Sequence, residues 1–417
     1  MYLNIIFFFL FKTIISYIKF SFIIEEDIYA ESYIEKIMKT PLIFNIKIGK
    51  PIQLVPIYIK IDERYSYLSG TAISKHIYNE KKSSTYQKKE SEKTYYDTSF
   101  INGIPSIETF QFETNKNKII EFTNFTFILA TNESRKLDIN SGVLGLKLTQ
   151  YTYDKDGYFL YELKFKGLTD SYSWTIKLKN DKEGDIYIGE YPHEYDTSNY
   201  NNDNYKSTRV GNEAGKPTWN MIFDRVYFGE NNKIEEEVQA IINYESGVIE
   251  GVSSFIKEVG ENYFNQYLDK ECFFQRTKVS NYYYYICDTS IDITKFPKLI
   301  FFNRDMNMNF ELNYKDLFVK KNGKYHFLIV FYVMNTFKWT FGRPFLKKYQ
   351  IVFDHDRKLI GTYTQIGRSF PWNTFIIIIL GLIIIALVYY IIMYFKNRPK
   401  RIKANELLED LDYLTKN

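Results

Sequence analysis

Cysteine is scarce in this sequence, which has two in 417 residues. With only Cys272 and Cys287 present, the paired spacings of a structural zinc site are excluded, and we expect no metal and no cofactor. Strong charge of one sign is also lacking, since the net charge is +4. No basic tract with interleaved aromatic residues precedes the C-terminal region, so the sequence predicts no nucleic-acid partner.

The composition is that of a folded protein, with 45% hydrophobic and 25% charged residues. The length allows one large bilobal domain, or two ordinary domains with appendages.

The N-terminal residues 5–24 are apolar, interrupted by Lys12, Ser16, Lys19 and Ser21. This pattern predicts a secretory signal peptide over residues 1–24, cleaved within residues 23–30. An early positive charge is missing from it, so an N-terminal anchor or a core strand stays open as an alternative.

The C-terminal residues 375–393 contain no charge and are nearly all apolar, which predicts a transmembrane helix over residues 373–395. A basic cluster follows, and the positive-inside rule places residues 396–417 in the cytosol. We expect a single-pass type I protein of the secretory pathway or cell surface, with a lumenal or extracellular ectodomain. The sequons at Asn124 and Asn132 would then be glycosylated. A buried core helix is the alternative for this segment.

The first half of the chain contains a series of strand and turn motifs. Residues 42–48 alternate as a half-buried strand, and Gly-Lys-Pro-Ile-Gln turns the chain at residues 49–53. A second apolar strand then ends near Asp62. Further along come Ser-Ser-Thr-Tyr at 83–86 and Gly-Val-Leu-Gly-Leu at 142–146.

The second half has a matching series. Ala-Ile-Ile-Asn at residues 240–243 ends a buried strand, and a short helix is predicted at 253–259. Residues 339–354 read Trp-Thr-Phe-Gly-Arg-Pro-Phe-Leu-Lys-Lys-Tyr-Gln-Ile-Val-Phe-Asp. Phe345, Leu346 and Tyr349 have helical spacing, and a strand follows them.

Together these motifs resemble the pepsin-like aspartic proteases over about residues 41–363. The resemblance implies an all-β, bilobal fold with a central cleft, with an N-terminal lobe at 41–190 and a C-terminal lobe at 191–366. It also implies a disulfide between Cys272 and Cys287, and a peptide-covering flap hairpin with Tyr96 as its tyrosine.

The resemblance places the two catalytic positions at Asp62 and Asn243. The family uses two carboxylates that share one proton, and an amide cannot take that role. The Thr-Gly that follows each aspartate is also replaced. We therefore expect Arg64 and Glu245 to prevent the usual backbone N–H contacts at the two catalytic positions. An ion pair between Arg64 and Glu245, as a structural replacement for the lost contacts, stays open as an alternative.

The predicted function is that of a membrane-anchored pseudoprotease whose ectodomain binds a peptide or protein. One alternative is an active aspartic endopeptidase with an atypical dyad, such as Asp62 with Glu245. Another is a surface glycoprotein that retains the fold for stability alone.

Overall fold

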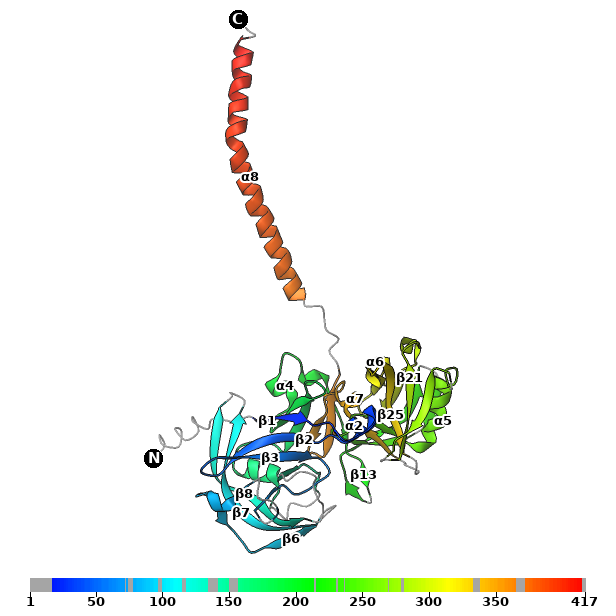
Figure 1. The fold of residues 1–417 in the computed structure, drawn as a ribbon. Helices are drawn as coiled ribbons and strands as arrows, with labels where there is room; N and C mark the ends of the chain where they lie inside the picture. The colour runs from blue at the N-terminus through cyan, green and yellow to red at the C-terminus, as the bar shows by residue number, and fades with distance from the viewer. Residues whose placement is uncertain are drawn as a thin grey trace, which may run out of the picture. The chain divides into compact units, whose positions relative to one another are not determined.

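The computed structural model describes residues 17–71, 73, 78–96, 100–114, 118–133, 142–149, 157–213, 215–229, 232–235, 237–268, 270–278, 281–332, 338–364 and 372–414. The chain divides into two compact units, Met1–Thr364 and Gln365–Asn417. The first unit is built mostly of β-strands, as predicted (Figure 1).

A 14-stranded sheet forms the N-terminal lobe and continues into the region between the lobes. Its main path runs β12-β28-β27-β10-β11-β1-β2-β3-β9-β4-β8-β7-β5, and β6 pairs with β7. These strands are β1 (Ile18–Ile24), β2 (Leu42–Ile48), β3 (Gln53–Lys60), β4 (Tyr67–Ser69), β5 (Gln87–Lys88), β6 (Lys93–Tyr96), β7 (Phe100–Thr114), β8 (Ile119–Glu133), β9 (Gly142–Gly145), β10 (Ser173–Leu178), β11 (Glu183–Ile188), β12 (Tyr205–Arg209), β27 (Val352–Asp354) and β28 (Leu359–Tyr363).

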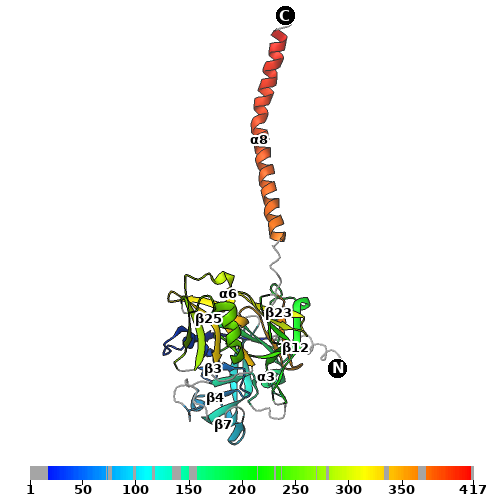
Figure 2. The same ribbon diagram turned by 90° about the vertical axis from the view of Figure 1, so that its right-hand side faces the viewer.

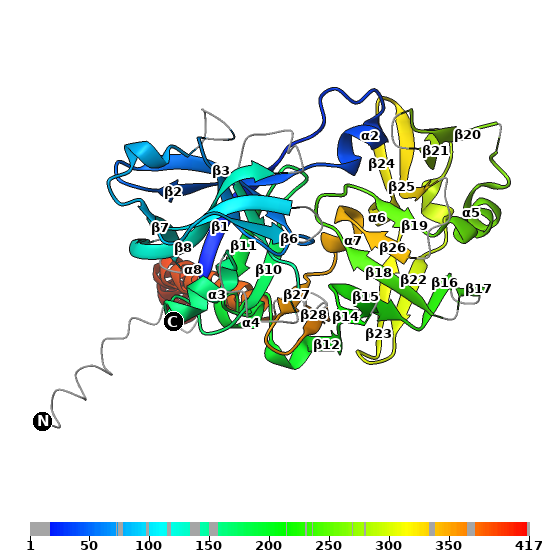
Figure 3. The ribbon, with the colours of Figure 1, turned by 90° about the horizontal axis from the view of Figure 1, so that it is seen from below.

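The C-terminal lobe contains an eight-stranded and a four-stranded sheet, which lie beside the first lobe in Figure 3. The larger sheet comprises β15 (Asn220–Phe223), β18 (Val238–Ile242), β19 (Ile249–Gly251), β20 (Cys272–Arg276), β21 (Tyr282–Asp288), β24 (Phe318–Lys321), β25 (Lys324–Tyr332) and β26 (Lys338–Phe341). The smaller comprises β16 (Arg225–Phe228), β17 (Asn232–Glu235), β22 (Leu299–Asn303) and β23 (Met308–Leu312).

The short helices lie around these sheets. They are α2 (Tyr33–Met38), α3 (Phe159–Phe165), α4 (Pro192–Tyr195), α5 (Ile256–Val259), α6 (Tyr314–Leu317) and α7 (Arg343–Leu346). The predicted short helix at 253–259 is confirmed as the 3-10 turn Ser253–Phe255 followed by α5.

The lobes are not divided at a single point in the chain. Strands β12, β27 and β28 fall within the predicted C-terminal lobe at 191–366, yet they join the large sheet through the pairing of β10 with β27. The C-terminal strands therefore return to the sheet that the N-terminal strands begin.

Strand β1 corrects the predicted cleavage of a signal peptide within residues 23–30. The strand lies between β11 and β2, and its residues Ile18, Phe20, Phe22 and Ile24 are buried in the core. Cleavage in that window would remove an interior strand, so the core-strand alternative holds for residues 18–24. Residues 1–16 of the predicted leader lie outside the described part of the chain.

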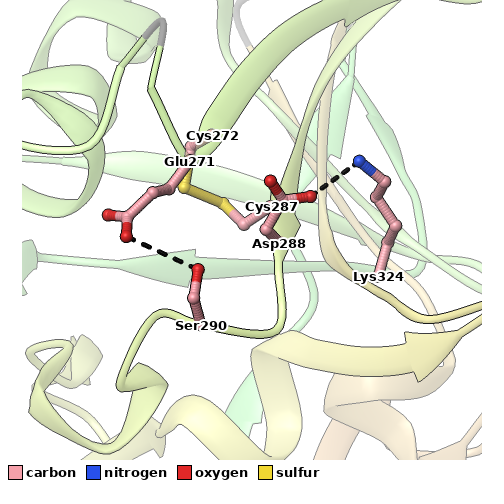
Figure 4. Close-up of a disulfide and its surroundings, with 6 residues drawn as sticks. All are labelled: Glu271, Cys272, Cys287, Asp288, Ser290 and Lys324. Atoms are coloured by element: carbon pink, nitrogen blue, oxygen red, sulfur yellow. Dashed lines mark hydrogen bonds and ion pairs between the residues drawn. A yellow bond between two sulfur atoms is a disulfide. The ribbon is translucent and has the colours of Figure 1, made fainter.

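The predicted disulfide is present between Cys272 on β20 and Cys287 on β21 (Figure 4). These residues are direct cross-strand partners, and both are fully buried. The adjacent Asp288 carboxylate pairs with the Lys324 ammonium of β25 at 2.7 Å. The bridge thus fixes the outer hairpin of the C-terminal lobe.

The second unit contains one long helix, α8 (Trp372–Leu414), seen in full in Figure 2. Its segment Ile379–Lys396 is apolar enough to cross a bilayer, with a mean hydropathy of 2.3. It is a candidate membrane span by length and composition, and it overlaps the predicted span, residues 373–395.

Candidate functional site

The two lobes repeat one arrangement of strands. In the N-terminal lobe β3 runs parallel to β9, and Lys60 lies opposite Gly145. In the C-terminal lobe β18 runs parallel to β26, and Ile242 lies opposite Phe341. The next residue, Asn243, donates its backbone N–H to the Phe341 carbonyl oxygen at 3.0 Å, so it reaches the level of Gly342.

In each lobe, the strand that follows this parallel pair shows which residues of the two lobes correspond. Strand β4 meets β9 at Tyr67 and Val143, and runs parallel to β8. Strand β19 likewise meets β26 at Glu250 and Thr340, and runs parallel to β25. Tyr67 and Glu250 are therefore counterparts, and seven residues before them stand Lys60 and Asn243 respectively.

Two glycines confirm this register. A Cβ atom on Gly145 would lie within 3.0 Å of the carbonyl oxygens of Glu63 and Tyr65. A Cβ atom on Gly342 would meet those of Ser246 and Val248 in the same way. Glu63 and Ser246 each stand three residues after Lys60 and Asn243, so the two loops close on their glycines identically.

The position that mirrors Asn243 is thus Lys60, and the placement of Asp62 there is two residues out of register. Asp62 lies in the turn after β3, and it is exposed. The sequence prediction required a carboxylate at this catalytic position, and it therefore assigned Asp62 and not Lys60.

Lys60 forms an ion pair across the floor between the lobes. Its ammonium lies 2.7 Å from Oε1 and 2.8 Å from Oε2 of Glu245. The two side chains are 17% and 28% exposed, which places the pair at a partly hydrated floor. The sequence left Arg64 open as a partner of Glu245, whereas the Arg64 guanidinium lies over the Tyr65 ring, 5.0 Å from its centroid.

The Asn243 side chain is engaged within its own loop. Its Oδ1 accepts the Glu245 backbone N–H at 2.9 Å. The prediction that glutamate in place of glycine would prevent this contact is therefore wrong. The loop needs one side-chain oxygen as acceptor, which both asparagine and aspartate provide. It therefore forms without the second oxygen of a carboxylate.

A segment of the N-terminal lobe binds the same loop from outside. Thr40 donates its N–H and its Oγ1 hydroxyl to the Glu245 carbonyl oxygen at 2.9 and 2.7 Å. Gly247 donates its N–H to the carbonyl oxygen of Ile37, on α2. Figure 3 shows α2 lying beside β24 and β25 of the other lobe.

Arg343 completes the support of this loop. Its Nη1 donates to the carbonyl oxygens of Tyr244 and Glu245, at 3.2 Å each, and to the hydroxyl of Thr40. Burial lowers the pKa of the guanidinium to about 10, which leaves it charged at neutral pH. The floor is thus fixed by backbone contacts that hold Asn243 and Glu245 in place.

A hollow of about 1020 Å³ opens at the ion pair, lined by Tyr58, Lys60 and Glu245 among others. Lys39 and Lys182 also reach it, as do the acidic residues Glu25, Glu26 and Asp27. Its size suits an extended ligand with several side chains. At its floor the hollow offers the ammonium of Lys60 and the carboxylate of Glu245.

Strands β6 and β7 pair at the place where the sequence predicts the flap. Tyr96 lies opposite Phe100 at its end and is 74% exposed. The neighbouring Tyr95 is buried, with its ring centroid 5.1 Å from that of Tyr65. The substrate-binding role of Tyr96 stays a prediction.

No group of three or more histidine, cysteine, aspartate or glutamate side chains in the described part of the chain is placed to hold a metal ion.

Comparison with known families agrees with this architecture. The sequence model of the family described as eukaryotic aspartyl protease matches residues 61–364. The chain belongs to this family. No curated protein matches the sequence significantly. The aspartyl protease match includes strands of both lobes. It begins one residue after Lys60, so β1, β2 and β3 lie outside it.

Proposed function

We propose that this aspartyl protease family member binds an extended peptide or protein segment in its cleft without hydrolysing it. The observation that supports this most is the pair of mirrored positions, Lys60 and Asn243. Hydrolysis needs one group to accept a proton from water and another to donate one to the scissile carbonyl. An ammonium and an amide do not perform this exchange near neutral pH.

The atypical dyad is disfavoured by the same geometry. Both oxygens of Glu245 lie within hydrogen-bond distance of the Lys60 ammonium. Asp62 lies exposed in the turn beyond it. A water activated by Glu245 would have to compete with that lysine for the carboxylate oxygens.

Peptide binding does not depend on the dyad, because strand-like pairing of main chains gives affinity by itself. The test is a fluorescence anisotropy titration of the full-length protein in detergent with a library of labelled extended peptides. We expect saturable binding that unlabelled peptide displaces. If no peptide binds, the protein keeps the fold without a peptide ligand, and the proposal fails.

The proposed setting is a single-pass type I membrane protein with the cleft outside the cytosol. Asn124 and Asn132 are both exposed on β8, as acceptors for glycosylation must be. Protease treatment of sealed vesicles should leave the Met1–Thr364 unit intact, and an endoglycosidase should then lower its mass. Digestion of that unit from the cytosolic side would overturn this topology.

A further inference from the structure

A second hollow, of about 320 Å³, lies on the C-terminal lobe. Ile241 of β18 and Thr340 of β26 contribute to its lining. Along β18, Gln239 and Ile241 are partly exposed, whereas Val238, Ala240 and Ile242 are buried. Because side chains alternate along a strand, Ile241 projects on the same side as Asn243, two residues later. The hollow therefore adjoins the cleft floor.

Glu250 of β19 also lines this hollow. Its Oε2 accepts a hydrogen bond from the Tyr282 hydroxyl at 3.1 Å. Within the described residues, this neutral hydroxyl is the hydrogen-bond partner of the carboxylate, and no ion pair involves Glu250. Burial raises its pKa, opposed by the Tyr282 hydrogen bond and by the charge of Lys39.

The other charges of the hollow cancel. Lys338 places its ammonium 2.6 Å from Oε1 of Glu213, and both residues line the space. Among the residues that line the hollow, Glu250 is thus the carboxylate that forms no ion pair, and the charge of Lys39 acts on it from outside the lining. Burial of such a group is costly unless a counter-charge reaches it.

We infer that this hollow receives the lysine or arginine side chain of a bound peptide, with Glu250 as the receptor carboxylate. Ile241 offers an apolar wall for the aliphatic stem of such a side chain. Tyr332, which lines the same hollow, offers an aromatic ring to the cationic head. The inference rests on the proposed peptide binding, and it specifies that the bound peptide carries a basic side chain.

The test uses full-length protein in detergent and pairs of labelled peptides that bind it. The pairs differ only by lysine against norleucine, or arginine against citrulline, at one position at a time. At one position, the neutral analogue should bind at least about tenfold more weakly, as for loss of a charged contact. Glu250→Gln should remove that difference, so that the two peptides of a pair bind with equal affinity.

Glu237→Gln is the matched control, because Glu237 is exposed on the same lobe. It should leave the lysine preference unchanged. Equal affinities for charged and neutral peptides at every position would overturn the inference, even if the variants fail to fold, because this comparison needs only the wild-type protein.

A second probe separates this inference from the proposed function. Butylguanidinium should raise the Tm of the wild-type protein and not that of Glu250→Gln. This result supports the cation site even if no peptide binds and the proposed function fails. Peptide binding without any preference for basic residues leaves the proposed function standing and removes the cation site.

Discussion

The ammonium of Lys60 changes the charge at the floor of the cleft. Two acidic groups sharing one proton are the working unit of an aspartic protease. Here one lobe supplies a cation and the other an amide, and Glu245 supplies the carboxylate that pairs with the cation. The floor is thus a neutral, hydrogen-bonding surface.

The ion pair should also connect the lobes energetically. In a double-mutant cycle with Lys60→Ala and Glu245→Ala, we expect a coupling free energy of about 1 kcal/mol, because the pair is only partly hydrated. Urea unfolding of the four proteins measures it. Lys164→Ala with Asp356→Ala, an exposed pair, is the control and should couple more weakly. Additive effects of the first pair would show that it contributes nothing to stability.

His355 predicts how stability depends on pH. Burial lowers its pKa from 6.5 to about 4, and its Nε2 accepts the Thr149 backbone N–H at 3.1 Å. Between pH 6.5 and about 4, the His355 imidazole is therefore protonated in the unfolded chain and neutral in the folded protein. Stability should fall as pH falls from 6.5 to about 4, by roughly 3 kcal/mol from this residue.

Unfolding by urea at pH 4.5, 5.5 and 7 tests this expectation, with His355→Gln as the variant. The slope of stability against pH should be smaller in the variant. His326 is a second buried histidine whose pKa burial lowers, so His326→Gln serves as a comparison. An unchanged slope in His355→Gln would show that this imidazole is not the group responsible.

At the residue scale the sequence marks the two mirrored positions unequally. Asn243 ends a strand whose apolar residues are clear in the sequence. For the first lobe, the preference for an acidic residue favoured Asp62, although the turn after β3 begins at Ile61. Only the pairing of Lys60 with Gly145 identifies the last residue in the strand.

At the scale of elements, periodicity predicted the regular parts. Strand β2 covers the predicted residues 42–48, and α7 with β27 follows the order predicted for residues 343–353. Strand β1 was expected only as an alternative to a leader, because its apolar residues continue a longer apolar run. Period alone does not separate a leader from a buried strand there.

Removing β1 tests its role in the core. A variant lacking residues 18–24 loses four buried apolar side chains. At about 1.5 to 3 kcal/mol each, their burial amounts to roughly 6 to 12 kcal/mol. This is comparable to the whole stability of an ordinary domain, so we expect no cooperative unfolding transition.

Circular dichroism with thermal melting measures the effect of the deletion. The control lacks residues 415–417, at the far end of the chain, and should melt as the wild type does. A cooperative transition in the β1-deleted protein would show that the strand is dispensable, and would return residues 18–24 to the predicted leader.

At the scale of the whole molecule, the repeated lobe explains why a non-catalytic floor is compatible with the fold. Each lobe closes its loop on a glycine, Gly145 or Gly342, where a Cβ atom would lie within 3.0 Å of carbonyl oxygens of the loop. Arg343 and Thr40 then hold the second loop through its carbonyl oxygens. None of these contacts requires an aspartate at Lys60 or Asn243, so fold and catalysis are separable here.

The most direct test is mass spectrometry of a peptide library incubated with the full-length protein between pH 3 and 7. We expect no cleavage by the wild type. We also expect none by Asn243→Asp, because Lys60 still occupies the mirrored position. Specific cleavage by the wild type that is lost in Asp62→Ala or Glu245→Ala would contradict the account and establish an active endopeptidase.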